Sequence, residues 1–230
     1  MKRLTAVLIV TTAFAAAAWA DDVMPPAYRG LPGSTTQEWD FVTGDPVGGG
    51  FFVYMVPDGT SSITHNPYAT PGNWDFVVDC SQTGIGRWVD GAGRGDGGAW
   101  YDFDAMMAEV PNTGNWEPGT WKDLRIQITY WDPTHAGPPI LNVRDEVPAW
   151  PVNNWSVKLA DGWYIYIEDW RMEPNPRQEY VDIYAATAPA PDSYAVSEVV
   201  IDTRCVPEPA TMTLMGLGLA GLVAKRKGRP

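Results

Sequence analysis

The chain has 230 residues, with 28 acidic and 16 basic side chains and a formal net charge of −12. Six of the basic side chains lie in the two end segments, so residues 21–205 carry 10 basic side chains against 27 acidic ones. A body this acidic is repelled by phosphate backbones, and we therefore expect no nucleic-acid binding.

The chain begins with the features of a secretory signal peptide. Lys2 and Arg3 precede an uncharged apolar run over residues 4–18, and small residues lead to a cleavage site after Ala20. A retained N-terminal membrane helix is the alternative, but the run is shorter than the roughly 20 residues that a span needs. We expect residues 1–20 to be removed by a signal peptidase, which makes the protein an exported one.

Residues 21–205 are expected to form one domain, because about 185 residues suffice for a single core but not for two. The ordered stretches are short, rich in aromatic and β-branched residues, and separated by Gly, Pro, Asn and Asp. Several alternate with a period of two, as in Leu124, Ile126, Ile128 and Tyr130, which predicts strands with one buried face. Strands are expected at 38–43, 51–56, 74–79, 87–90, 99–104, 123–131, 154–160, 162–172, 179–185 and 193–203.

This pattern predicts an all-β fold, an antiparallel β-sandwich of the jelly-roll type, with a closed barrel as the alternative. Alternating βα units are excluded because no helices are available between the strands. Only residues 104–110 are expected to form a short helical turn.

The two cysteines, Cys80 and Cys205, are an even count in an exported protein. That count predicts one disulfide, which would tie the last strand to the middle of the domain.

The C-terminal segment, residues 206–230, combines three features. Val206-Pro207-Glu208-Pro209 comes first, an uncharged stretch with three glycines follows over 210–224, and a basic cluster begins at Lys225. A helix over 210–224 would span about 22 Å, less than the roughly 30 Å of a hydrocarbon core. The basic cluster would hold this end on the cytoplasmic side of the membrane.

This arrangement resembles the PEP-CTERM sorting signal, and the stretches at 174–184 and 196–209 resemble those of planctomycete-type PEP-CTERM proteins. The resemblance implies transient tethering in the inner membrane through a transmembrane helix. It also implies processing at Pro207, Glu208 and Pro209 by an exosortase-type enzyme, with delivery to the cell envelope or the extracellular space. An anchor that is never cut is the alternative.

The body shows little catalytic chemistry. His65 and His135 have no Cys or second His at ligand spacing, so no zinc site is expected. No nucleophile motif is present, and the strand pattern Glu-x-Asp-x-x-Glu of jelly-roll glucanases is absent. We therefore expect no enzymatic activity and no required cofactor, with a secreted glycoside hydrolase as the least favoured reading.

One loop is a candidate calcium site. Residues 90–104 contain four aspartates, Asp90, Asp96, Asp102 and Asp104, together with five glycines, and their carboxylate and carbonyl oxygens suit Ca²⁺. A solvated surface loop without a metal is the alternative.

The aromatic content suggests binding of extracellular polysaccharide, because exposed Trp and Tyr rings stack on pyranose rings. Trp100, Tyr101 and Trp116 are the first candidates, with Trp121 and Trp150 beside them. The alternative is that these rings belong to the core.

Together these features predict an exported protein of the envelope or extracellular matrix with a non-enzymatic, structural or adhesive role. A carbohydrate-binding module of the same fold is the alternative.

Overall fold

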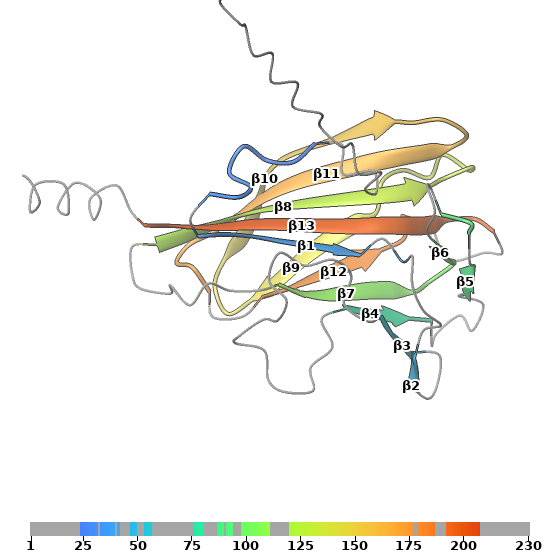
Figure 1. Ribbon diagram of the computed structural model, residues 1–230, viewed down its shortest axis with the longest axis horizontal. Helices are drawn as coiled ribbons and strands as arrows, with labels where there is room; N and C mark the ends of the chain where they lie inside the picture. Colours follow the sequence, from blue (N-terminus) through green and yellow to red (C-terminus); the bar gives the residue numbers. More distant parts are fainter. Residues whose placement is uncertain are drawn as a thin grey trace, which may run out of the picture.

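A computed structural model of the chain describes residues 24–31, 33–39, 41, 47–49, 53–56, 76–80, 87–89, 91–93, 98–110, 120–176, 179–186 and 192–207. These residues form two antiparallel sheets (Figure 1). The strands are β1 (Ser34–Trp39), β2 (Val47–Gly49), β3 (Val53–Val56), β4 (Phe76–Asp79), β5 (Arg87–Val89), β6 (Ala99–Tyr101), β7 (Ala105–Val110), β8 (Thr120–Trp131), β9 (Ile140–Asp145), β10 (Ala149–Lys158), β11 (Trp163–Met172), β12 (Glu179–Tyr184) and β13 (Ala195–Pro207).

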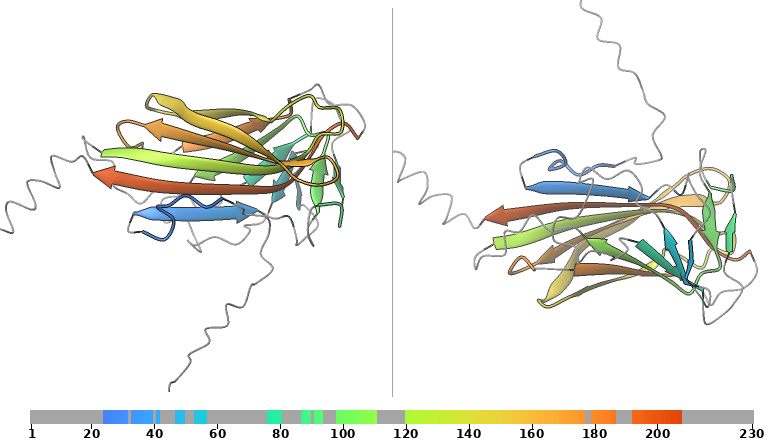
Figure 2. Two further views of the ribbon diagram at one scale, coloured as in Figure 1. Left: turned by 90° about the horizontal axis from the view of Figure 1, so that it is seen from above. Right: turned by 60° about the horizontal axis from the view of Figure 1, so that its bottom comes forward.

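The larger sheet has the order β10-β11-β8-β13-β6-β5, and β1 also pairs with β13. Strands β1 and β6 contact successive segments of β13, at residues 199–204 and 195–196 respectively. The smaller sheet has the order β2-β3-β4-β7-β12-β9. The two sheets lie as separate layers in the views of Figure 2. The predicted all-β antiparallel fold is confirmed.

The core lies between the two sheets and follows the alternation seen in the sequence. Leu124, Ile126, Ile128 and Tyr130 of β8 are at most 3% exposed and pack with Val199 and Ile201 of β13. The smaller sheet contributes Phe76, Val78, Met106, Ala108, Val181 and Ile183. Because side chains alternate across a strand, the residues between these positions point to the outer faces.

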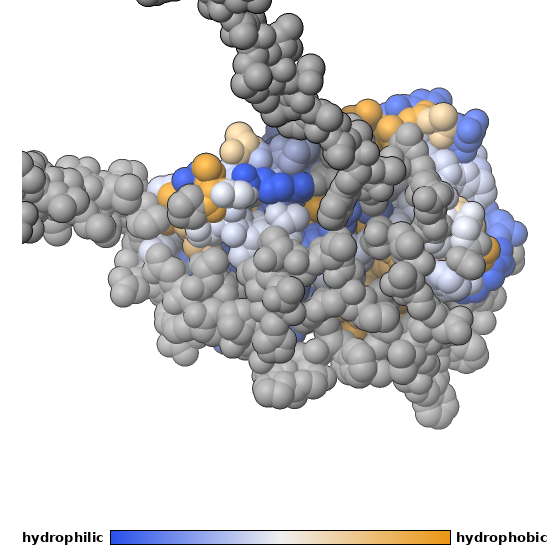
Figure 3. All heavy atoms as spheres, in the orientation of Figure 1, coloured by the Kyte–Doolittle hydropathy of each residue, from blue (hydrophilic) through white to orange (hydrophobic). Residues whose placement is uncertain are grey.

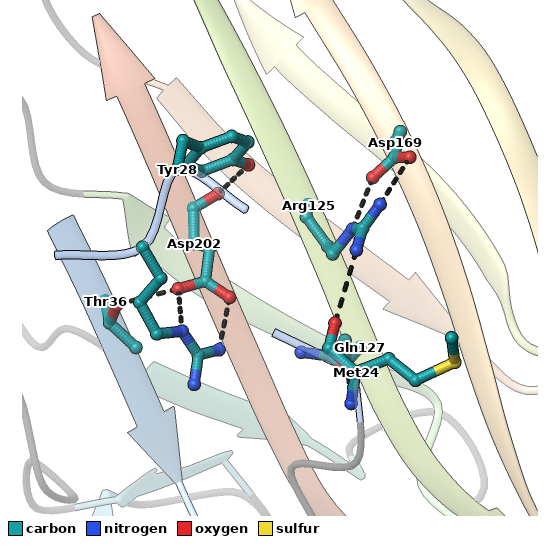
Figure 4. A network of polar contacts seen from close by, with 8 residues as sticks. Met24, Tyr28, Thr36, Arg125, Gln127, Asp169 and Asp202 are labelled. Carbon is teal, nitrogen blue, oxygen red and sulfur yellow. Dashed lines mark hydrogen bonds and ion pairs between the residues drawn. The ribbon is translucent and has the colours of Figure 1, made fainter. Parts of the chain in front are cut away.

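Part of the outer face of the larger sheet is buried as well. Ile165, Ile167 and Val200 are at most 1% exposed, although they do not belong to the core cluster between the sheets. The segment 24–31 lies against this face and forms hydrogen bonds with β8 and β13 (Figure 4). The larger sheet therefore buries apolar side chains on both faces.

The predicted helical turn at 104–110 is wrong. Residues 105–110 form β7, a strand inside the smaller sheet that pairs with β4 on one side and β12 on the other. Pairing on both sides outweighs the helix preference of its Ala, Met and Glu residues, which amounts to only tenths of a kcal/mol per residue.

The predicted disulfide is also wrong, because Cys80 and Cys205 are both free and buried. Cys80 directly follows β4. The N–H of Asp104 donates to the carbonyl of Asp79, and the N–H of Asp102 donates to the carbonyl of Tyr194, which places Cys80 at the end of the sandwich where β13 begins. Cys205 lies ten residues further along β13, about 30 Å from that end at the usual rise of a strand. Bridged cysteines need Cα atoms within roughly 7 Å of each other. The sandwich holds this pair at opposite ends, which is too far apart for a disulfide.

The predicted signal peptide, residues 1–20, and most of the C-terminal segment lie outside the described residues. Among the residues that the structure does describe, none forms a helix long and apolar enough to cross a membrane.

Candidate functional site at the outer face of the larger sheet

Four side chains gather on the outer face of the larger sheet, at the end where β13 finishes. They are Trp121 and Asp123 of β8, Trp150 of β10 and Arg171 of β11, and we call them the tryptophan–arginine cluster. Residues directly opposite one another in an antiparallel pair share a face. Arg171 is opposite Asp123 on one side and Trp150 on the other, which brings three strands together at this point.

Arg171 organises this cluster. Its Nε and Nη2 atoms donate to Asp123 Oδ1 at 2.8 and 2.6 Å, and its guanidinium carbon lies 5.5 Å from the centre of the Trp121 ring. The indole N–H of Trp121 donates to Asp123 Oδ2 at 3.4 Å. The position of the Trp121 ring is thus set by a cation–π contact and a hydrogen bond together.

The cluster is open to solvent. Trp150 is 40% exposed, and the side chains of Arg171 and Asp123 are 42% and 26% exposed. An aromatic ring can cover the apolar face of a sugar, while a guanidinium and a carboxylate exchange hydrogen bonds with its hydroxyls. This combination of groups suits a polar ligand with apolar faces, such as a saccharide.

A second polar group on the same face fastens the segment 24–31 to the sheet (Figure 4). Arg125 of β8 forms two hydrogen bonds with Asp169 of β11, at 2.7 and 2.9 Å, and donates a third to the carbonyl of Met24. Asp202 of β13 accepts hydrogen bonds from Arg29 and Thr36. The segment 24–31 thus covers part of the outer face, and the tryptophan–arginine cluster lies beside the covered part.

The structure corrects one of the predicted glycan contacts and leaves the others open. Trp100 is 1% exposed and belongs to the core, so it cannot stack on a ligand. Tyr101 is half-buried, with its ring 5.9 Å from that of Trp131 and Arg87 placed over it. Trp116 lies outside the described residues. Trp121 and Trp150 are the predicted candidates that the fold brings together.

The sequence contained a signal for this cluster. Trp121, Asp123 and Arg125 are out of phase with the apolar series that begins at Leu124, and out-of-phase positions on a half-buried strand face outward. Arg171 could not be placed in the same way, because both faces of β11 carry apolar residues. Its two partners come from β8 and β10, and only the pairing order of the strands reveals them.

The predicted calcium ligands are only partly within the described residues. Asp102 is fully buried, and its two carboxylate oxygens accept hydrogen bonds from the backbone N–H groups of Asp192 and Ser193 at 2.9 and 3.0 Å. It therefore fastens the approach to β13 onto the turn after β6. The backbone N–H of Asp104 donates to Asp79. Asp90 and Asp96 lie outside the described residues, and a calcium site at this loop stays a prediction.

Among the described residues, no group of three or more His, Cys, Asp or Glu side chains is arranged to hold a metal ion. The large hydrophobic side chains that are exposed in this part of the chain are Met24, Leu31, Ile140, Trp150, Val152 and Tyr184. In the view of Figure 3, the coloured hydrophobic atoms form small separate groups among hydrophilic ones. Groups of this size are normal on a soluble surface.

Strand β13 connects the domain directly to the predicted sorting segment (Figure 1). Its last paired residues are Val206, opposite Trp121, and Pro207, opposite Thr120. The first proline of the Pro-Glu-Pro motif is therefore still part of the sheet, and no linker separates the motif from the fold.

Comparison with known proteins supports the assignment of this segment. The family model for the PEP-CTERM protein-sorting motif matches residues 206–227. Neither a curated protein nor a solved structure matches the chain. The chain therefore carries a PEP-CTERM protein-sorting motif, which begins in the last strand of its β-sandwich and implies export by exosortase sorting.

Proposed function

We propose that this protein is an exported, non-enzymatic component of the cell envelope or extracellular matrix with a structural or adhesive role. The observation that supports the proposal most strongly is the sorting motif at residues 206–227, which starts inside β13. Strand β13 pairs with β8, β1 and β6 in the larger sheet. The sorting motif is therefore joined directly to a strand of the sandwich.

The proposed path to the surface has two cuts. Signal peptidase removes residues 1–20 after export, and the segment beyond Pro209 holds the domain in the membrane for a time. An exosortase-type enzyme then acts at Pro207-Glu208-Pro209 and releases the domain.

The Glu208→Ala variant tests the second cut in the native host. We expect mass spectrometry of the wild-type protein to find the basic tail missing, and to find it attached in Glu208→Ala. Glu146→Ala is the matched control, because Glu146 is an exposed glutamate in the body of the domain. A wild-type protein that keeps its tail would show instead that the segment is a permanent anchor.

The tryptophan–arginine cluster supports a second candidate function, binding of extracellular polysaccharide. Its two rings come from adjacent parts of one sheet face and its charged groups are half-exposed. Binding at this site is compatible with an adhesive role, since the sorted domain would then hold the matrix that surrounds the cell.

A glycan array probed with the mature domain tests this second function. We expect Trp121→Ala and Trp150→Ala each to weaken binding roughly tenfold, which corresponds to about 1.4 kcal/mol. Trp163→Ala is the control, because Trp163 lies on the same outer face at the opposite end of β8 and is half-buried. Binding to no glycan, or equal losses in all three variants, would contradict glycan binding at this cluster. Only the structural role would then remain.

The finer fold is part of the proposal. Consecutive strands from β7 to β9, and again from β11 to β13, alternate between the two sheets. That alternation supports a sandwich of jelly-roll type, and an experimental structure of the whole mature chain would test it.

A further inference from the structure

A charged pair lies in the interior between the two sheets. Lys122 is on the inward side of β8, next to Leu124, and Glu179 is the first residue of β12 in the opposite sheet. Both side chains are 0% exposed, and the Lys122 ammonium contacts the Glu179 carboxylate. Within the part of the chain that the structure describes, no other donor reaches either oxygen of Glu179. Lysine and glutamate are almost never fully buried in proteins unless they are paired, as they are here.

A third ionisable group lies beside this pair. Asp145 is directly opposite Glu179 in the pairing of β9 with β12, so the two side chains share a face of the smaller sheet. Asp145 Oδ1 accepts a hydrogen bond from the N–H of Val147 at 3.1 Å. Its Oδ2 is buried and has no hydrogen-bond donor among the described residues. One carboxylate oxygen is thus left available next to the charged pair.

Burial weakens the charged state of the pair and makes Asp145 a stronger base. It lowers the pKa of Lys122 to about 8, although the nearby Cys205 and Asp145 oppose this shift. It raises the pKa of Asp145 to about 6, so this group is a carboxylate at neutral pH and can accept a proton. In a medium of low dielectric constant, moving one proton from Lys122 to Glu179 converts an ion pair into a neutral amine and a carboxylic acid without changing the total charge. These two neutral groups are the reactants of amide formation.

We propose that Lys122 and Glu179 join in an intramolecular amide bond, with Asp145 transferring the protons. The lone pair of the neutral Nζ attacks Cδ of the protonated Glu179 carboxyl group, and Asp145 accepts a proton from the nitrogen. Asp145 then returns this proton to a hydroxyl of the tetrahedral intermediate. The C–O bond breaks, one water leaves, and the C–N bond remains. The reaction needs no oxidant, reductant or cofactor.

The fold holds the two reacting groups in contact. This contact removes the entropic cost of a bimolecular encounter, which is a large part of the barrier to such a reaction. The product removes two charges from the core and links the larger sheet to the smaller one. Lys122 is opposite Cys205, near the end of β13, so the link would reinforce the sandwich beside the strand that leads to the sorting motif. This inference does not depend on the proposed sorting or glycan-binding roles.

Asn175 is the competing partner. Its side chain is 2% exposed, and its Oδ1 atom is 3.6 Å from Sγ of Cys205, at the same end of the interior. An amide formed between Lys122 and Asn175 would release ammonia, whereas the bond with Glu179 releases water. The two products therefore differ in mass and in the peptides that are joined.

Mass spectrometry of the full chain, fully denatured and then digested with trypsin, tests the proposal. We expect the protein to be one water lighter than the sequence between its processed ends, with the peptides containing Lys122 and Glu179 joined and no cleavage after Lys122. The Asp145→Asn variant should have the unmodified mass of that same sequence and separate peptides. This readout does not require a variant to fold, because the wild-type mass alone decides it.

Two results would overturn the proposal. One is a wild-type protein with the unmodified mass of the sequence between its processed ends and with Lys122 and Glu179 in separate peptides. The other is a protein one ammonia lighter, with Lys122 joined to Asn175.

Discussion

Arg29 and Asp202 are 173 residues apart in the chain and form a two-point ion pair on the outer face of the larger sheet, with Arg29 Nε 2.6 Å from Asp202 Oδ1. The Asp202 side chain is completely buried, and the Arg29 side chain is 25% exposed. Asp202 also accepts a hydrogen bond from Thr36 at 2.7 Å, and its carbonyl accepts one from the Tyr28 hydroxyl at 3.2 Å. One buried carboxylate thus fastens the segment 24–31 to β13 and β1 (Figure 4).

Arg29→Ala should therefore destabilise the fold. Removing the guanidinium leaves a buried carboxylate with Thr36 as its remaining side-chain donor among the described residues, and we expect a loss of about 2–4 kcal/mol in the free energy of unfolding. Urea denaturation followed by tryptophan fluorescence measures this loss. Arg87→Ala is the matched control, because the Arg87–Asp192 pair is 48% and 60% exposed and should contribute at most about 1 kcal/mol. Equal losses in the two variants would contradict the role of the segment as a cover for the sheet.

Trp100→Ala separates a core role from a binding role. Because Trp100 is 1% exposed, its removal leaves a cavity and should lower the free energy of unfolding by about 3–5 kcal/mol. Trp150→Ala, at a ring that is 40% exposed, should change it by about 0.5 kcal/mol or less. Thermal and urea unfolding of both variants provide the measurement. A stable Trp100→Ala protein would show that the ring is not part of the core.

The two cysteines should behave as buried thiols. Burial, followed by the negative charges of Asp104 and Asp79, raises the pKa of Cys80 to about 12, which removes the reactive thiolate at neutral pH. We expect a thiol reagent to label neither cysteine in the native protein and both in urea without a reductant. Labelling of none in urea would indicate a disulfide after all.

Stability should depend on pH through Asp145. Its pKa is about 6 in the folded protein against an ordinary value of 3.8, so the folded state holds this proton over a pH range in which the unfolded state has lost it. The stabilisation is complete below about pH 4 and is lost as the pH rises to about 6. The urea midpoint of unfolding should therefore fall less steeply with rising pH in Asp145→Asn than in the wild type. Asparagine keeps an acceptor for the N–H of Val147, so the variant preserves this hydrogen bond.

Glu146→Gln controls for the loss of a neighbouring acidic group, since Glu146 is exposed and its charge is only a minor cause of the raised pKa of Asp145. Burial also raises the pKa of Glu168, whose contribution is the same in all three proteins and cancels in the comparison. Identical slopes for wild type and Asp145→Asn would show that Asp145 titrates normally in the folded state.

Much of the strand content was predictable from the sequence because alternation is a local property. The phase of Leu124, Ile126 and Ile128 identified the buried face of β8, and the sorting motif was recognisable from Pro207, Glu208 and Pro209 with their apolar and basic neighbours. Strand β9 was not predicted, since its alternation is weak and three of its six residues are polar or charged. The helical turn assigned to β7 failed because local preference is weaker than pairing on both sides.

What only the tertiary structure decided are the relationships between residues far apart in the chain. The length of β13 separates Cys80 from Cys205, and the order of the strands brings Trp121, Trp150 and Arg171 together. The facing of the two sheets buries Lys122 against Glu179. Local patterns determine which side of a strand is apolar, but the partner of a side chain depends on which strands pair and which sheets face each other, because those contacts are made across the fold rather than along the chain.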